Sequence, residues 1–249
     1  MPLPSGGGGG KHLKTASLSP NAEEPLAALQ ERIILCRKCP RLVLHRERSG
    51  EVKRASFQQW VYWSRPVPSF GDPHARVCAI GLAPAAHGGN RTGRMFTGDA
   101  SARFLMQALY ETGFASQPSS EHREDGLVLR DIYLTAALRC APPGDKPVRE
   151  EMANCAPFLA QELASLPQLR AVLVLGRIAF DAYLRLVSQG RGEPVRLPFR
   201  HGARYELGEG SPTLFVSYHP SPRNHNTGRL TRTDFVEVLK QVKREIEIG

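Results

Sequence analysis

Residues 76–82 read RVCAIGL, and from Gly81 the chain continues as GLAPAAHGGNRTGRMFTGD to Asp99, so a short apolar run opens into a loop of small and polar residues. An unbroken apolar run of this length is typical of a strand that is buried on both faces of a parallel sheet. Three later runs have the same character and complete a prediction of four short, mainly parallel strands: DIYLTAAL (131–138), RAVLVLG (170–176) and TLFVSY (213–218).

Helical periodicity fills the intervals that follow these strands. Apolar residues recur at helical spacing in the ranges 100–113, 149–166, 177–187 and 233–248. Strands that alternate with helices predict an α/β fold with three layers, α/β/α, in which helices cover both faces of a short central sheet. The carboxyl ends of parallel strands share one edge, so the loops that follow the four strands should converge on a single cleft.

The composition indicates one globular domain with a basic surface. The 249 residues include 33 Lys and Arg against 24 Asp and Glu, a net charge of +9, which favours a nucleic acid partner over a membrane or an acidic protein. Residues 1–22 are rich in Gly, Pro and Ser and are predicted to form a disordered tail, which leaves 23–249 as a single folded domain. The sequence has neither the hydrophobic centre of a signal peptide nor a long apolar span, so we expect a cytoplasmic protein, acting as a monomer.

The loop at 81–99 has the composition of a ligand-binding wall. It matches neither the phosphate loop of nucleotide-binding proteins nor the dinucleotide fingerprint. Its small side chains allow backbone N–H groups to approach a ligand closely, and an aromatic ring can stack on a planar group. Arg91 and Arg94 are candidates for contacts with a phosphodiester. The residues expected to line the substrate pocket are Gly81, Ala83, Ala85, His87, Gly88 and Phe96.

Asp99 ends this loop and is open to two interpretations. It comes directly before a predicted helix, where Asp is a favoured N-cap residue. A carboxylate that is fixed at a helix start is also oriented and kept ionised, so the same side chain is a candidate catalytic group. The two roles are compatible.

The last predicted strand is followed by YHPSPRN at 218–224 and by a basic run that extends to Arg232. Pro220 and Pro222 stiffen the turn, so His219 is predicted to point into the cleft as a second catalytic candidate. The polar residues of this segment suit contacts with a DNA backbone or groove: Ser221, Arg223, Asn224, Thr227 and Arg229.

Four of the five cysteines are candidates for one metal or cluster site. Cys36 and Cys39 form a C-x-x-C pair and Cys140 and Cys155 a wider second pair, whereas Cys78 lies alone in the first strand. Four thiolates are compatible with a zinc ion, but the wide second pair does not form a zinc knuckle. An iron–sulfur cluster that joins the N-terminal segment to the loop after the second strand fits the layout better, and unmetallated buried thiols are the remaining alternative.

These segments together resemble the uracil-DNA glycosylase superfamily, and most closely its family 5, or B-type, enzymes. The resemblance runs from about Ile34 to the last helix. It rests on four motifs in order: CRKCPRL (36–42), GLAPAAHGGNRTGRMFTGD (81–99), RCAPPGDKP (139–147) and HPSPRN with TGRL (219–230). It implies a three-layer fold, DNA as the partner and a structural 4Fe-4S cluster with the ligands Cys36, Cys39, Cys140 and Cys155.

The resemblance also implies roles for single residues. Asp99 matches the acid that assists the attacking water, His219 and Asn224 match functional residues of the last motif, and Phe96 matches the ring that stacks on an extruded base. Asp145 is expected beside the substrate, where related sequences often have Asn. The first motif departs from many members of the superfamily, which carry an acid or Asn at the position of Ala85.

The predicted function is a monofunctional DNA glycosylase that excises uracil and leaves an abasic site for base excision repair, with no lysine placed for a lyase step. Double-stranded DNA is the expected partner and single-stranded DNA a second form. Small residues at Ala85, Ala86 and Ala136 predict a wide pocket that also admits hypoxanthine and xanthine. The alternative is a non-catalytic iron–sulfur DNA-binding protein on the same scaffold. A zinc hydrolase is disfavoured, because the sequence offers no three-ligand site with an open position.

Overall fold

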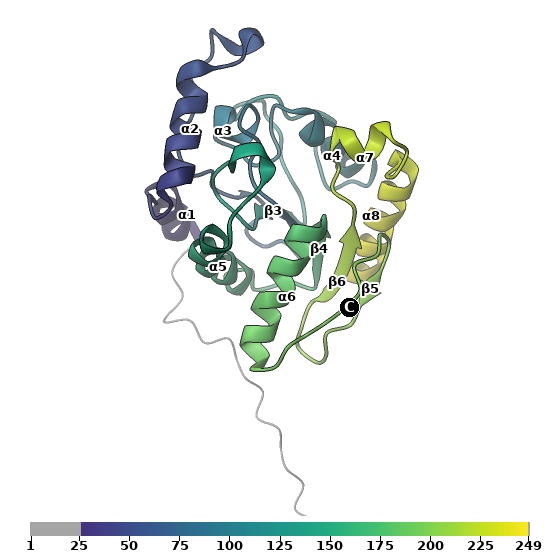
Figure 1. The fold of residues 1–249 in the computed structure, drawn as a ribbon. Helices are drawn as coiled ribbons and strands as arrows, with labels where there is room; N and C mark the ends of the chain where they lie inside the picture. The colour runs from purple at the N-terminus through teal and green to yellow at the C-terminus, as the bar shows by residue number, and fades with distance from the viewer. Residues whose placement is uncertain (1–25, 249) are drawn as a thin grey trace, which may run out of the picture.

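The computed structural model describes residues 26–248, and the tail expected at 1–22 lies outside the described residues. Its centre is a twisted six-stranded sheet with the order β1-β3-β2-β4-β6-β5 (Figure 1). The four inner strands are parallel, which confirms the predicted α/β class and the four predicted runs. These strands are β2 (Val77–Gly81), β3 (Ile132–Ala136), β4 (Ala171–Leu175) and β6 (Thr213–Ser217).

The two outer strands correct the prediction of a four-stranded sheet. β1 (Phe70–Gly71) pairs with β3, and β5 (Arg204–Tyr205) pairs with β6, both in antiparallel fashion. Each has two residues, which is too short to show any periodicity in a sequence.

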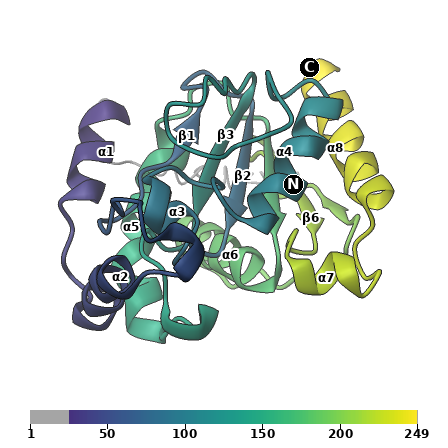
Figure 2. The same ribbon diagram turned by 90° about the horizontal axis from the view of Figure 1, so that it is seen from above.

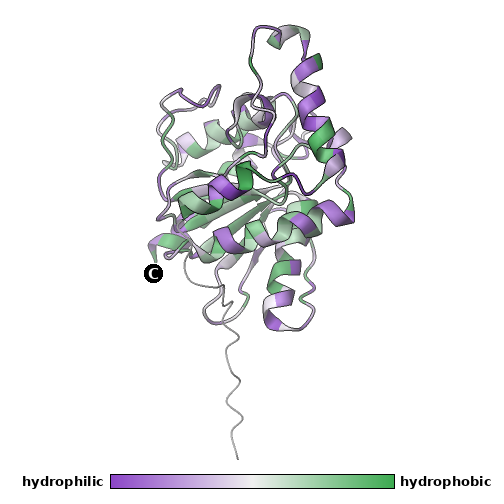
Figure 3. Ribbon diagram, turned by 90° about the vertical axis from the view of Figure 1, so that its left-hand side faces the viewer, coloured by the Kyte–Doolittle hydropathy of each residue, from purple (hydrophilic) through white to green (hydrophobic). Residues whose placement is uncertain are grey.

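Helices cover both faces of the sheet, as the alternating pattern predicts. Val77 and Ala79 face a core formed with α4 (Ala100–Glu111) and α8 (Arg232–Glu247). Cys78 and Ile80 face the opposite core, formed with α5 (Arg149–Ala164) and α6 (Arg177–Arg191). In Figure 3 the strands and the inner sides of these helices carry most of the hydrophobic colour. No helix among residues 26–248 has the length and apolar character needed to cross a membrane.

Several helices were not predicted from the sequence. α1 (Leu26–Ile34) and α2 (Pro40–Val52) flank the sheet beside α5 and bury Leu29, Ile33 and Leu42 in a third core. Four others have no more than five residues, so they show no amphipathic repeat: η1 (Ala55–Phe57), α3 (Gly89–Thr92), η2 (Pro143–Asp145) and α7 (Pro222–Asn226).

The loops that follow the parallel strands lie together at one edge of the sheet. Figure 2 views the molecule from above, with α3 and α7 on either side of the strand ends. The chain passes from β2 to β3 on one side and from β4 to β6 on the other, so the order of strands reverses between β2 and β4. Ligands of open α/β sheets bind at such a switch point.

Candidate active site

Asp99 caps α4 and is also enclosed by the first-motif loop. Its Oδ1 accepts a hydrogen bond from the backbone N–H of Ala102 at 2.9 Å, which confirms the predicted N-cap. A Cβ atom at Gly88 would overlap Asp99 Oδ2, so the carboxylate packs directly against that glycine. Burial raises the pKa of Asp99, while backbone N–H groups and the charges of Arg91 and Arg103 lower it. The cap therefore holds a partly desolvated carboxylate in one orientation.

His219 lies over the other side of the switch point. A Cβ atom at Gly176, directly after β4, would stand 3.1 Å from His219 Cβ, so the glycine makes room for this side chain. Burial lowers the pKa of His219 to about 4, although the charge of Asp145 opposes the shift. The imidazole is therefore neutral at pH 7 and carries one N–H donor.

Asn224 holds the loop that carries His219. Its Nδ2 donates to the His219 carbonyl oxygen at 2.8 Å, and the Ser221 N–H donates to the same oxygen at 2.7 Å. The structure thus gives the Asn224 amide a role in fixing the turn, which the sequence motif does not reveal.

Phe96 lies over the end of β2. A Cβ atom at Gly81 would stand 2.6 Å from Phe96 Cζ, so a side chain at Gly81 would displace the ring. Phe96 has a φ of 47°, which costs on the order of 1–3 kcal/mol for a bulky residue and marks a position where structure is held for a purpose. The ring packs beside Met95 and Ala136, and Ala136 is the Cα partner of Gly81 across the sheet.

Three other expected pocket residues have different surroundings. His87 Nδ1 is 2.9 Å from the Tyr62 hydroxyl, and burial lowers the pKa of His87. The carbonyl oxygen of Ala85 accepts from two N–H groups of the loop and closes its turn. Ala83 packs against the core that contains the cysteines, away from Phe96 and toward the neighbouring site.

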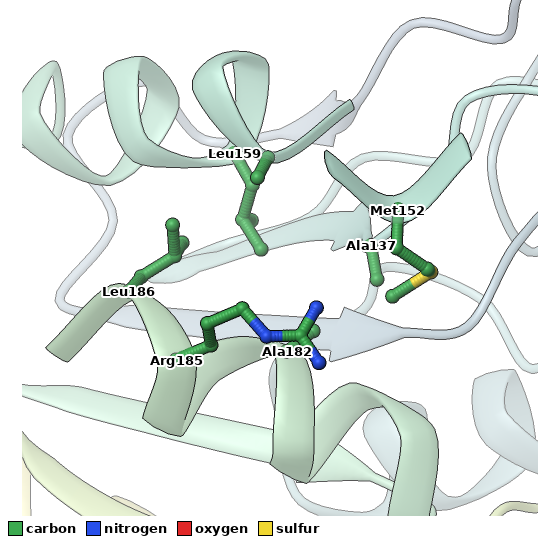
Figure 4. A pocket seen from close by; sticks show the side chains of 7 residues that line it. Ala137, Met152, Leu159, Ala182, Arg185 and Leu186 are labelled. Carbon is green, nitrogen blue, oxygen red and sulfur yellow. The ribbon is translucent and has the colours of Figure 1, made fainter. Parts of the chain in front are cut away.

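Asp145 is exposed at the end of η2 and has a φ of 56°, in the left-handed region that both Asp and Asn tolerate. It also lines an open groove of about 410 Å³ that continues along α6 past Lys146 and Arg149. A separate apolar pocket between α5 and α6 has about 10 Å³ of free space and contains none of the expected site residues (Figure 4). It has room for at most one water molecule.

Two of the expected DNA contacts are corrected. Arg91 and Arg94 are 3% and 5% exposed, so their guanidinium groups are inside the protein. Arg91 donates to the carbonyl oxygens of His87 and Gly98, both at 2.8 Å. Arg94 forms an ion pair with Asp125 at 2.7 Å. The sequence shows the charge of these residues and not their burial, which is why both were assigned to the surface.

The other expected DNA contacts lie on or beside α7. Arg223, Thr227 and Arg229 are exposed, and Ser221 is half-buried at the N-cap of the helix. The guanidinium carbon of Arg229 is 4.4 Å from the centre of the Tyr218 ring. These residues form a basic surface, and they follow His219 directly in the sequence.

The four predicted cysteine ligands lie in or against one apolar core. Cys36 and Cys39 pack against the core that buries Cys140 and Cys155, while Cys78 is buried on the α5–α6 face of the sheet. Burial raises the pKa of Cys140 to about 11 and that of Cys155 to about 12. Among residues 26–248 no three His, Cys, Asp or Glu side chains stand in an arrangement that could hold a metal ion.

A buried arginine, which the sequence analysis missed, contacts one of these sulfur atoms, that of Cys140. Arg46 is 2% exposed, and its NH1 atom is 3.0 Å from Cys140 Sγ and 3.3 Å from the Cys36 carbonyl oxygen. Its Nε has no hydrogen-bond partner in the described structure. Position 46 lies in an otherwise amphipathic helix, so no sequence signal separates it from a surface arginine.

Comparison with known proteins agrees with this architecture. The sequence pattern of the Uracil DNA glycosylase superfamily matches residues 68–243. The chain belongs to the uracil DNA glycosylase superfamily. It is 51% identical over 217 residues to a Type-5 uracil-DNA glycosylase of Thermus thermophilus, covering 87% of this chain and 96% of the relative. It is 45% identical over 210 residues to a Type-5 uracil-DNA glycosylase of Pyrobaculum aerophilum, covering 84% and 88%.

A third relative, the Type-5 uracil-DNA glycosylase of Mycobacterium bovis, is 43% identical over 220 residues, which cover 88% of this chain and 81% of the relative. The resemblance to family 5 that the four motifs indicated is thereby confirmed. The matched pattern begins at residue 68, after Cys36 and Cys39, whereas the Thermus match extends over most of the chain.

Proposed function

We propose that this protein excises uracil from DNA by hydrolysing the N-glycosidic bond, as a monofunctional glycosylase that leaves an abasic site for base excision repair. The observation that carries the proposal is that two loops at the same edge of the sheet, after β2 and after β6, hold a fixed carboxylate and a neutral imidazole. The names of the Type-5 relatives support the same activity.

The chemistry needs two kinds of stabilisation at the scissile bond. The base leaves as an anion while the sugar acquires oxocarbenium character. The neutral His219 donates its N–H to the leaving base, because preorganised donors are most effective toward charge that develops in the transition state. The Asp99 carboxylate stabilises the positive sugar and orients the attacking water.

Phe96 receives the base once it has left the duplex. Extrusion costs a few kcal/mol, and least for a mispaired base, which contributes to selectivity. Stacking on an aromatic ring returns about 1–3 kcal/mol. The strained φ of Phe96 and the bare Gly81 beneath it support a ring held in place for this contact.

The end of β3 has an alanine where a polar side chain would restrict the site to uracil. Ala136, beside Phe96 and opposite Gly81, is a small apolar residue in a position where an amide would pair with the base. Strong rejection of analogues requires buried polar pairing. We therefore include hypoxanthine and xanthine among the excised bases, selected by shape and leaving-group ability.

The four cysteines bind a structural 4Fe-4S cluster in this proposal. Their thiols share one apolar pocket, and thiolates are the usual ligands of such clusters. Arg46 supports this assignment: its guanidinium is buried against Cys140 Sγ and its Nε has no hydrogen-bond partner among the described residues, so a negative charge beside it would compensate its own. Deprotonated cysteines around a cluster provide that charge. The cluster joins the segment before α2 to the loop after β3 and supplies stability, with no part in bond cleavage.

The test is single-turnover cleavage of duplexes that carry one uracil, hypoxanthine or xanthine, followed by alkaline cleavage of the abasic site. The wild type should cleave all three, and the Asp99→Asn variant should bind the uracil duplex but cleave it far more slowly. Binding of uracil duplexes without any cleavage by the wild type would establish the alternative, a non-catalytic DNA-binding protein.

A further inference from the structure

The segment between α2 and β1 has a surface that the proposed site does not use. We call residues 53–65 the basic arm. It leaves the end of α2, forms η1 and returns along α3, where the Trp63 and Ser64 N–H groups donate to the carbonyl oxygens of Arg91 and Asn90 at 3.0 and 3.1 Å. Figures 1 and 3 show this turn standing above the rest of the molecule, on the side of the strand ends.

The arm has the charge and shape of a surface for a polyanion. Between Glu51 and Asp72 the chain contains no acidic residue, whereas it contains Lys53, Arg54 and Arg65. Arg54 and Arg65 are exposed. Arg123 adds a fourth cation, with its guanidinium carbon 4.3 Å from the centre of the Trp63 ring. Such a patch attracts a nucleic acid backbone. Binding is also favoured because the nucleic acid releases its condensed cations when the protein's basic side chains neutralise its phosphates.

One apolar and two polar uncharged side chains accompany this charge. Val61 is 92% exposed, and Gln58 and Gln59 before it are also exposed. These side chains are free to contact a bound molecule. The basic side chains of the arm suit the charged phosphates of DNA, and the glutamines and Val61 suit the uncharged sugars beside them.

Arg91 joins the arm to the first-motif loop, residues 81–99, which we also call the catalytic loop. Its guanidinium carbon is 4.0 Å from the centre of the Phe57 ring and 3.9 Å from that of Trp60, which places the cation against both rings. The same group donates to the carbonyl oxygens of His87 and Gly98, one residue before Asp99. Tyr62, also in the arm, bonds His87. The arm is therefore fixed relative to Asp99.

We propose that the basic arm is a docking surface for the DNA backbone beside the extruded nucleotide, on the side of the cleft opposite α7, and that Arg91 keeps it in register with the catalytic loop. The proposal rests on the proposed function in taking DNA as the substrate. Its contacts are to phosphates, so they raise affinity for any sequence and leave the chemical step unchanged.

The test compares two double variants that remove the same charge. Arg54→Ala with Arg65→Ala changes the arm, and Arg170→Ala with Arg196→Ala changes exposed arginines before β4 and after α6. Affinity for a duplex with a non-cleavable abasic site is measured from low to high salt. The arm variant should lose roughly tenfold to a hundredfold in affinity and about 1.8 units of the salt slope, about 0.9 per phosphate contact. The control variant should lose much less.

Cleavage at saturating DNA separates this proposal from the function on which it rests. The arm variant should cleave bound uracil duplex at the wild-type single-turnover rate. Equal affinity and equal salt slope in the two double variants would overturn the arm as a docking surface, even in an active enzyme. A wild type that cleaves nothing would refute the proposed function instead.

The role of Arg91 is tested by coupling. Arg91→Gln should weaken DNA binding in the wild-type background. It should have little further effect in the arm variant, because Arg91 contributes to binding only by positioning the arm. Trp60→Leu makes the same test from the other side of the contact if Arg91→Gln does not fold. If the losses of DNA-binding free energy were additive when Arg91→Gln and Trp60→Leu are each combined with the arm variant, Arg91 would not act by positioning the arm.

Discussion

Arg94 in the loop at residues 81–99 and Arg46 beside the cysteines are both buried, but their charges are compensated in different ways. In the loop, Arg94 has Asp125 at 2.7 Å, and the Asp99 carboxylate has the Ala102 N–H at 2.9 Å. In the pocket, Arg46 reaches a sulfur atom and a carbonyl oxygen, and its Nε has no partner in the described structure. The charges of Arg94 and Asp99 therefore have partners within the loop and its neighbours, although Arg91 NH1 in the same loop is buried without a hydrogen-bond partner in the described structure. Under the proposed 4Fe-4S assignment, deprotonated cysteines would supply the negative charge beside Arg46.

This difference makes Arg46 the residue at which the proposed cluster can be tested. Isolated buried charges cost several kcal/mol, so a guanidinium at 2% exposure must gain that free energy from its surroundings. The two regions also touch: Asn90, in the first-motif loop, donates to the Arg46 carbonyl oxygen at 3.1 Å. The helix that carries Arg46 is therefore in direct contact with the loop that encloses Asp99.

The largest expected effect is that of Arg46→Met. With an anionic 4Fe-4S cluster in the pocket, this variant breaks a buried charge pair and should lose about 3–5 kcal/mol of stability together with most of its iron. The measurements are melting temperature, visible absorption and iron content after anaerobic purification, where the wild type should contain about four irons per chain.

The direction in which Arg46→Met changes the melting temperature distinguishes a bound cluster from four neutral thiols. If the pocket held four neutral thiols, Arg46→Met would remove an uncompensated charge and raise the melting temperature. Arg94→Met is the matched control, because it leaves Asp125 unpaired and should destabilise the protein without affecting iron content. Stoichiometric zinc and no iron in the wild type would contradict the cluster.

The sequence was informative wherever apolar periodicity decides structure. The four inner strands and the helices on both faces follow from continuous apolar runs and helical repeats, whereas β1 and β5 depend on pairing with a neighbour that no local pattern encodes. Capping by Asp99 was predicted for the same reason, since the preference for an acid at a helix start is local.

Burial of polar side chains could not be predicted in the same way. Arg91 and Arg94 occur in a glycine-rich stretch that has every mark of an exposed loop, yet aromatic rings from residues 57–60 and the ion pair with Asp125 enclose them. Arg46 is hidden by the fold alone. Contacts between segments far apart in the sequence determine whether these arginines are buried, and the sequence does not show which segments make contact.

The second largest effect is expected from Asp99→Asn. Asn caps helices about as well as Asp, and the substitution removes a carboxylate whose pKa burial raises, so the melting temperature should be unchanged or higher. Single-turnover cleavage should fall by about a hundredfold or more. Asp99→Ala loses the cap as well, at about 1 kcal/mol. A cleavage rate within a few-fold of wild type in Asp99→Asn would reduce this residue to a helix cap.

A smaller effect, on selectivity, is expected from Ala136→Asn. The new amide should pair with uracil and lower the excision of hypoxanthine relative to uracil by roughly tenfold or more, since polar pairing discriminates more strongly than shape. Ala136→Leu is the control, because Leu has nearly the shape of Asn and cannot pair. Equal preference in the Asn and Leu variants would mean that steric pressure on Phe96, and not hydrogen bonding, sets the change.

The smallest effect concerns His219 and the dependence of stability on pH. Its pKa in the folded protein is about 4, below the value of about 6.5 in an unfolded chain, because burial disfavours the charged imidazole. The unfolded state therefore binds the extra proton, so the contribution of His219 is fully present above pH 6.5 and is lost as the pH falls toward 4. Solvent reaches part of the side chain, so we expect a loss of only about 1–2 kcal/mol.

His219→Gln removes the titrating group and should flatten the fall in melting temperature between pH 6.5 and 4 relative to the wild type. Asp145→Asn removes the negative charge that favours imidazolium, so it should lower the pKa of His219 further and steepen the fall. An imidazole titration by NMR measures the same pKa directly. A midpoint near 6.5 would show that His219 is cationic during part of the physiological range, and the leaving base would then receive a proton rather than a hydrogen bond.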